Sequence, residues 1–89
     1  MLTEAEARKK ILDLAHEFRA LMRQKQYAQA KYRYDTALNV AVFMELEDTE
    51  QFFGERGDKG EVIRKGEFPE ELVQKAFEMT AVRPPQRTS

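Results

Sequence analysis

The stretch QYAQAKYRYDTAL, residues 26–38, places alanines and tyrosines three and four residues apart. Tyr27, Ala30, Tyr34 and Ala37 therefore share one side of a helix, because an α-helix has 3.6 residues per turn. The small side chains of Ala30 and Ala37 allow two helix backbones to approach more closely than usual. We therefore predict that this stretch is a helix that lies along a second helix of the same chain.

The preceding segment supplies the second helix of this predicted pair. Thr3 and Glu6 have the spacing of a capping box, in which each side chain accepts a hydrogen bond from the backbone N–H of the other residue. Apolar side chains then recur three and four residues apart, at Ile11, Leu14, Ala15, Phe18, Leu21 and Met22. Polar residues 23–26 interrupt this pattern, so we expect a helix over residues 4–24 and a tight turn over residues 24–26.

The helix that starts at residue 27 is expected to continue to residue 47, and its composition changes near that end. Residues 40–44 are apolar in succession, and Leu46 follows shortly after. A helix that is apolar on all sides is buried on all sides, so one partner helix does not cover it. Either the C-terminal segment folds back onto residues 40–46, or a second chain covers them.

The segment after residue 47 shows only short sequence patterns, each of a few residues. Asp48 is expected to cap a turn of helix that carries Phe52 and Phe53, and Gly54 is expected to end it. A polar loop with three glycines follows over residues 54–61. The dipeptide Val62–Ile63 is the only candidate strand, and the sequence offers it no evident partner strand.

A third helix is predicted over residues 69–81. Pro69 suits the first position of a helix, and Glu70 and Glu71 suit the positive end of its dipole. Its inner stripe is expected to consist of Leu72, Val73, Ala76, Phe77 and Thr80. The predicted fold class is therefore all-α: a long antiparallel helical hairpin with a third, shorter helix packed across it. We expect one domain over residues 1–83 and a disordered tail over residues 84–89.

The composition restricts the chemistry that this chain supports. It has 89 residues, 15 lysines and arginines against 16 aspartates and glutamates, and no cysteine, which excludes disulfides and thiolate metal sites. Residues 8–33 are mainly basic and residues 35–61 are mainly acidic. This asymmetry indicates either solvated faces whose fields cancel at short range or charge pairing between chains. The polar N-terminus and the lack of an apolar run of about 20 residues predict a cytoplasmic protein without membrane contact.

No catalytic, cofactor or metal site is expected from the remaining motifs. His16 is the single histidine, and it has acidic neighbours but no nucleophile near it in sequence. The carboxylates of residues 45–50 lie at helical positions that point in different directions, so they do not share one cation. The loop 54–60 lacks the Gly-Lys-Ser/Thr ending of a phosphate-binding loop.

The pattern Tyr27-x2-Ala30-x3-Tyr34-x2-Ala37-Leu38 resembles the second helix of a tetratricopeptide repeat. This resemblance implies that Ala30 and Ala37 make tight helix contacts with Tyr34 packed between them. The hairpin does not recur along the chain, so the resemblance implies a local hairpin geometry. The runs 34–43 and 68–70 are similar to small uncharacterised bacterial proteins from phage or mobile-element regions, which implies no mechanism.

Two functions follow as hypotheses from these features. The first is a non-enzymatic protein–protein interaction or assembly module, a homodimer formed through an apolar surface of Val40, Phe43, Leu46, Phe52 and Phe53. The alternative is a small nucleic-acid-associated regulator, in which a basic region over residues 8–33 contacts phosphates and Tyr32 stacks on bases. The basic side chains of this alternative are Arg8, Lys9, Arg19, Arg23, Lys31 and Arg33.

Overall fold

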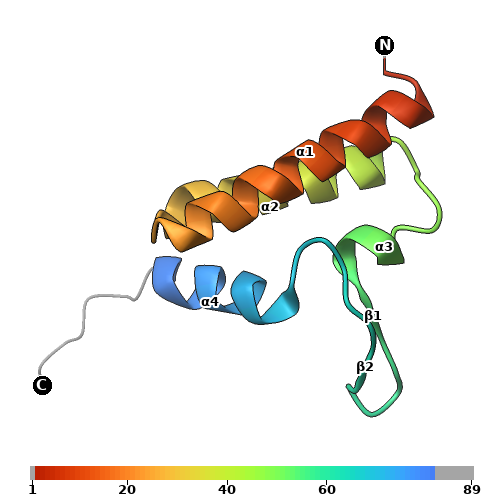
Figure 1. Ribbon diagram of the computed structural model, residues 1–89. Coiled ribbons are helices and arrows are strands. Elements are labelled where there is room, and N and C mark those ends of the chain that lie inside the picture. The colour runs from red at the N-terminus through yellow and green to blue at the C-terminus, as the bar shows by residue number, and fades with distance from the viewer. Residues whose placement is uncertain (1, 82–89) are drawn as a thin grey trace, which may run out of the picture.

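The computed structural model describes residues 2–81 as a helical hairpin with a shorter helix across it (Figure 1). Helices α1 (Glu4–Arg23) and α2 (Tyr27–Phe43) lie antiparallel, and α4 (Glu70–Thr80) crosses them. Between α2 and α4 the chain forms the short helix α3 (Glu50–Phe53) and an antiparallel hairpin of β1 (Glu55–Arg56) and β2 (Val62–Arg64). The predicted all-α class is confirmed, whereas the predicted tail and the end of the domain at residue 83 lie outside the described residues.

Helix α1 begins with the predicted capping box. The Thr3 N–H donates to Oε1 of Glu6 at 2.9 Å, and the Glu6 N–H donates to Oγ1 of Thr3 at 3.1 Å. Hydrogen bonding from the Thr3 backbone N–H, and secondly from the Thr3 side chain, lowers the pKa of the Glu6 carboxyl because it favours the charged form. The predicted apolar stripe of α1 faces the core, and its buried members are Ile11, Leu14, Ala15, Phe18 and Met22.

Both long helices end in the same backbone arrangement, with a non-glycine residue in the left-handed region. After α1, Lys25 has a φ of 60°, and the Gln26 N–H donates back to the Leu21 carbonyl at 2.9 Å. After α2, Glu45 has a φ of 51°, and the Leu46 N–H donates to the Ala41 carbonyl at 3.0 Å. The prediction that the second helix reaches residue 47 is therefore wrong, because this reversal ends α2 at Phe43.

The seam between α1 and α2 contains small side chains, as the alanine spacing predicts. Ala30 and Ala37 of α2 have no exposed surface, and neither does Ala15 of α1. Side chains of this size let the two backbones approach closely along the seam. The account of residues 26–38 as a helix packed along another helix of the same chain is confirmed.

Tyr34 lies at the centre of a cluster of aromatic rings that joins α2 to the rest of the chain. Its ring centroid is 6.3 Å from that of Phe18 on α1 and 5.3 Å from that of Phe68, which precedes α4. The rings of Phe53 and Phe77 meet it edge-on at 6.0 and 5.9 Å. Burial raises the pKa of the Tyr34 hydroxyl, and the nearby carboxylates Asp35 and Glu70 add to this rise.

The segment between α3 and α4 differs from the predicted loop. Val62 pairs with Arg56, so the candidate strand does have a partner, a two-residue strand too short and polar to be recognised from sequence. Asp48 has a φ of 52° and does not cap α3; its N-cap is Thr49, which makes no side-chain cap hydrogen bond. Gly54 ends α3 as predicted, with a φ of 81°.

Gly66 lies where the chain returns from the hairpin and passes against the end of α3. The next two residues continue this contact, because the Phe68 N–H donates to the Phe52 carbonyl at 2.9 Å. A Cβ atom on Gly66 would lie 2.3 Å from that carbonyl oxygen and 2.4 Å from the backbone nitrogen of Gly54. Only glycine at position 66 therefore allows the returning chain to pass this close to the backbone at the end of α3.

We expect the substitution Tyr34→Ala to lower the free energy of unfolding by about 3 kcal/mol, because it removes the ring that four other aromatic rings contact. Tyr34→Phe keeps the ring and is expected to cost less than about 1.5 kcal/mol. Urea denaturation followed by circular dichroism measures both values. Equal losses for the two variants would show that the ring does not hold the elements together.

We expect Gly66→Ala to destabilise the fold by about 3 kcal/mol or more, because the added methyl group meets backbone atoms that cannot rotate away. Gly60→Ala is the matched control: Gly60 has a φ of 81°, but no atom lies within 4 Å of its would-be Cβ. The control is therefore expected to lose only about 1 kcal/mol from backbone conformation. Thermal unfolding of both variants tests this, and similar losses would refute the close approach at Gly66.

Candidate functional site

A row of side chains on α2 faces away from α1 and α4. We call it the outer face of α2, and it consists of Tyr32, Thr36, Asn39, Val42 and Phe43. Phe43 is 85% exposed, Val42 is 74% exposed and Tyr32 is 65% exposed. These three are the most exposed large apolar side chains among residues 2–81. Large apolar groups gathered on one side of a helix are typical of surfaces at which proteins bind other molecules.

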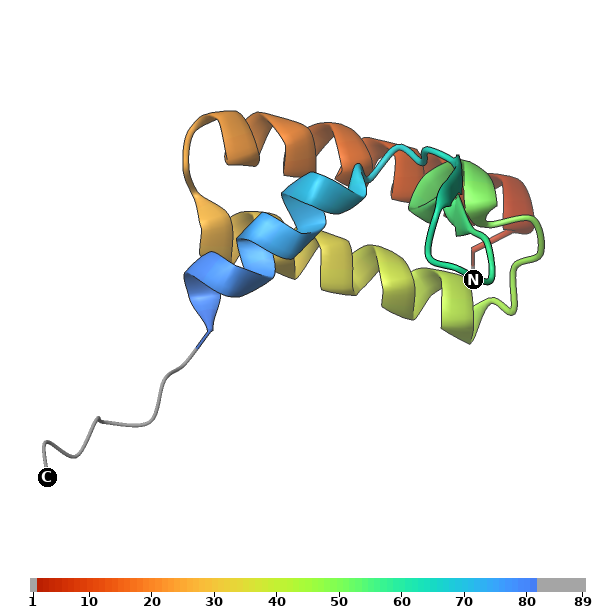
Figure 2. The ribbon, with the colours of Figure 1, turned by 90° about the horizontal axis from the view of Figure 1, so that it is seen from below.

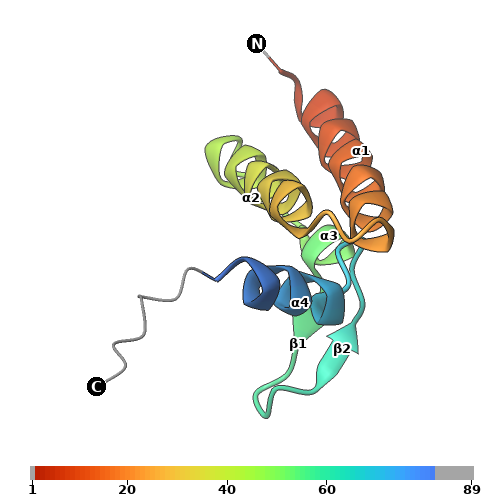
Figure 3. The same ribbon diagram turned by 90° about the vertical axis from the view of Figure 1, so that its left-hand side faces the viewer.

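The arrangement of the other elements explains why this face is open. Helix α4 contacts the N-terminal half of α2: Phe77 lies beside Tyr34, and Nζ of Lys75 lies 5.8 Å from the Tyr27 ring centroid. Figure 3 shows α1 along one side of α2 and α4 below it, with no element on the remaining side of α2, and Figure 2 shows α4 crossing in front of the two long helices. The C-terminal segment therefore folds back onto the N-terminal half of α2 and not onto residues 40–46, where Val42 and Phe43 stay exposed.

An apolar groove adjoins the outer face at the end of α2. It is lined by Leu2, just before α1, and by Val40, Phe43 and Met44 at the end of α2. Thr36 and Asn39 complete the lining with one hydroxyl and one amide. The Thr36 hydroxyl donates to the Tyr32 carbonyl of its own helix at 2.8 Å. The groove is therefore suited to an apolar side chain of a partner.

The end of the outer face that carries Asn39, Val42 and Phe43 lacks charge, which is unusual in this chain. At the other end, Cζ of Arg33 lies 5.7 Å from the Tyr32 ring centroid, and Asp35 follows Tyr32 three residues later. Residues 36–44 contain no charged side chain, although 31 of the 89 residues are charged. Charged residues are depleted, and aromatic residues enriched, at the centres of protein interfaces. Low charge and the most exposed ring, Phe43, thus occur together at the C-terminal end of α2.

The predicted interaction surface is only partly brought together. Phe52 is 1% exposed and packs in the core of the single chain, so it is not available to a partner. Phe53 is half-buried, with its ring stacked on Phe68 at 5.6 Å. Leu46 is half-buried against the core because the chain reversal at Glu45 turns it inward. Of the five predicted residues, Phe43 is on the outer face and Val40 lines the adjoining groove.

Tyr32, Thr36, Asn39, Val42 and Leu2 were not identified as a surface from the sequence. The sequence did contain a signal for Tyr32, Thr36 and Asn39. Together with Phe43 they follow one another at intervals of four, three and four residues. This spacing runs parallel to the buried stripe of Ala30, Tyr34, Ala37 and Ala41 on the same helix. Two stripes of similar period on one helix indicate two packing surfaces, of which the chain itself covers one.

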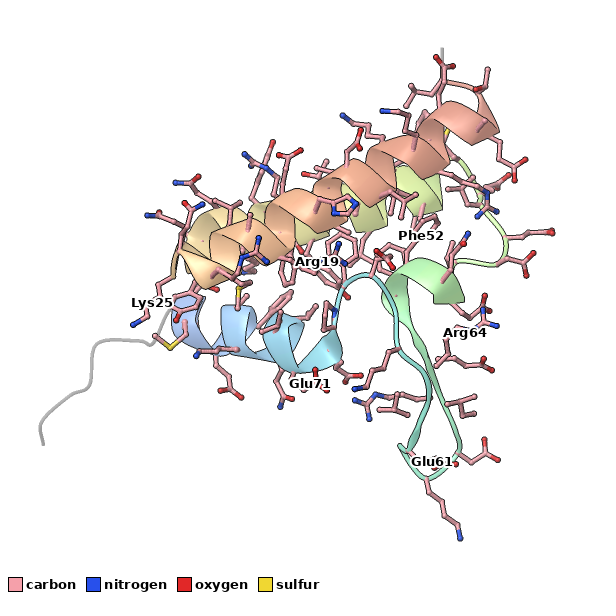
Figure 4. The ribbon with its side chains drawn as sticks, viewed as in Figure 1. Arg19, Lys25, Phe52, Glu61, Arg64 and Glu71 are labelled. Carbon is pink, nitrogen blue, oxygen red and sulfur yellow. The ribbon has the colours of Figure 1, made fainter. Side chains whose placement is uncertain are left out.

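The predicted nucleic-acid contacts are largely engaged within the chain. Arg8 pairs with Glu4, Lys9 with Asp13, Arg19 with Glu67, and Arg33 with Glu17. Arg19 also donates to the Glu67 carbonyl at 2.8 Å, which fixes the segment leading into α4 against α1. Nζ of Lys31 lies 5.0 Å from the Phe77 ring centroid, and no ion pair among residues 2–81 involves Arg23. Figure 4 shows Arg19 beside α1 and Lys25 at the turn between the two long helices.

Other candidate chemistry does not assemble into a site. His16 is exposed, and its Nδ1 accepts a hydrogen bond from the Arg19 guanidinium at 2.8 Å. Within residues 2–81, no three histidine or carboxylate side chains converge in a way that could hold a metal ion. No helix in this part of the chain is long and apolar enough to cross a membrane.

Comparison with protein-family models, with curated proteins and with solved structures finds no match for this chain. The similarities to a tetratricopeptide repeat and to small phage or mobile-element proteins therefore stay predictions. The candidate site depends on the geometry and composition of α2.

We expect this protein to bind duplex and single-stranded DNA more weakly than a dissociation constant of about 10⁻⁴ M near physiological salt, because carboxylates neutralise four of the six predicted contacts. Fluorescence anisotropy at two salt concentrations measures the affinity and its salt dependence. Micromolar binding that weakens steeply with salt, and that Arg23→Ala and Lys31→Ala reduce together, would instead support the nucleic-acid alternative.

Proposed function

We propose that this chain is a non-enzymatic assembly module that associates with other copies of itself through the outer face of α2. The observation that carries the proposal is the exposure of Phe43 and Val42, at 85% and 74%, on an uncharged stretch of a well-formed helix. An apolar surface of this kind gains free energy when another molecule removes it from water.

The size of the apolar surface indicates the strength of the association. Complete burial of one such side chain contributes about 1.5–3 kcal/mol, and a self-association buries the same side chains from both copies. The loss of translational and rotational freedom opposes this gain by several kcal/mol. The three large apolar side chains of the face, contributed by both copies, therefore support association at micromolar concentration, and such an association is reversible.

The two groups with an altered pKa, Glu6 and Tyr34, support a structural role for these side chains and not a catalytic one. The pKa of Glu6 is lowered by the capping box, and that of Tyr34 is raised chiefly by burial among aromatic rings. Both causes belong to the stability of the fold, and neither group lies beside a nucleophile or a metal-binding cluster. We therefore propose binding rather than catalysis, and we place the assembly in the cytoplasm because a chain without cysteine suits a reducing compartment.

We expect the protein to dimerise with a dissociation constant in the micromolar range, and the substitution Phe43→Asp to make it monomeric, because a carboxylate would be buried in an apolar contact. Sedimentation equilibrium over a wide range of concentrations measures both. The matched control is Ile63→Asp, which introduces the same charge at a 59% exposed apolar position on the hairpin.

The control is expected to dimerise like the unmodified chain. A protein that stays monomeric up to millimolar concentration would contradict the proposal. Association of the Phe43→Asp variant with unchanged affinity would show that another surface is responsible.

A further inference from the structure

The outer face of α2 has the spacing by which two helices pack along their length. Tyr32, Thr36, Asn39 and Phe43 are separated by four, three and four residues, which is the spacing of a helix-packing seam. With a rise of 1.5 Å per residue, this row covers roughly 16 Å of the helix. The occupant that this row fits best is therefore another helix of similar length.

The side chains in this row are arranged symmetrically about its midpoint. An aromatic ring lies at each end, Tyr32 at one and Phe43 at the other, and two short polar side chains, Thr36 and Asn39, lie between them. A two-fold interface brings one surface patch against an identical patch. When the two helices run antiparallel, the Phe43 ring of one copy meets Tyr32 of the other, and Thr36 meets Asn39.

The charges at the two ends of α2 favour this antiparallel arrangement. The turn before α2 carries Arg23 and Lys25, both exposed, and no ion pair among residues 2–81 involves either. The segment after α2 carries the exposed acids Glu45, Glu47 and Asp48. A parallel pair would bring like charges together at both ends, whereas an antiparallel pair brings the basic turn of each copy toward the acidic segment of the other.

We infer that a second copy of this chain docks on the outer face of α2 as an antiparallel two-fold helix pair centred between Thr36 and Asn39. This inference rests on the proposed function and adds the identity and the orientation of the partner. The rings at each end supply apolar contact. The Thr36 hydroxyl already donates to the Tyr32 carbonyl at 2.8 Å, so its oxygen accepts a hydrogen bond from the Asn39 amide of the other copy across the axis. The charged ends select the antiparallel orientation over the parallel one.

The absence of cysteine from the chain makes disulfide cross-linking a direct test of this geometry. Thr36→Cys and Asn39→Cys proteins of different mass are mixed and oxidised gently, and the linked species are separated by mass. An antiparallel pair places Cys at one position opposite Cys at the other, so mixed 36–39 links are expected to exceed 36–36 and 39–39 links several-fold. Gln74→Cys, exposed on α4, reports the background of random collisions.

Each result decides between the inference and the proposed function. Dominant 36–36 and 39–39 links would overturn the antiparallel orientation and leave self-association through this face intact. Links no more frequent than those of the Gln74→Cys control, in a protein that still sediments as a dimer, would show that a different face is used. Background linking in a protein that is monomeric would overturn both proposals.

Discussion

The packing of the Tyr34 ring determines where the other elements of this protein lie. Ala30 and Ala37, one turn on either side of it, are fully buried in the seam with α1, and their small side chains let two helices pack closely. The Tyr34 ring contacts Phe53, Phe68 and Phe77 as well as Phe18 of α1. As a result, α3, the segment before α4, and α4 all gather on one side of the helical hairpin.

The same constraint leaves the opposite side of α2 without an intramolecular partner. Because α4 is held at the N-terminal half of α2 by Tyr34 and Tyr27, it does not reach the apolar residues at the other end. The backbone reversal at Glu45 then directs Leu46 back to the core and leaves Phe43 exposed. One helix thus carries a buried set of aromatic contacts and a separate exposed set, and only the buried set is satisfied within the chain.

Features that depend on local spacing could be predicted from the sequence. The capping box at Thr3 and the alanine seam of α2 depend on residues a few positions apart, and both are present. The end of α2 could not be predicted, because Glu45 adopts a left-handed conformation that its residue type does not favour.

Features that depend on contacts between distant segments were also missed. Phe52 is adjacent in sequence to the half-buried Phe53, and its complete burial follows from the return of residues 66–68 against α3. In the sequence Arg19 has no evident acidic partner, whereas in the fold it forms an ion pair with Glu67, 48 residues later. The exposed face of α2 was predicted at Phe43, whereas the contribution of Tyr32, Thr36 and Asn39 requires knowing which sides α1 and α4 cover.

The division of the aromatic residues into a buried and an exposed set can be measured by NMR over a dilution series from millimolar to low micromolar concentration. If the outer face of α2 is covered by a second copy, the ring resonances of Phe43 and Tyr32 shift on dilution, while those of Phe18, Tyr34 and Phe68 stay constant. Resonances of Phe43 and Tyr32 that are independent of concentration, or that shift no more than those of Phe18, would contradict this account.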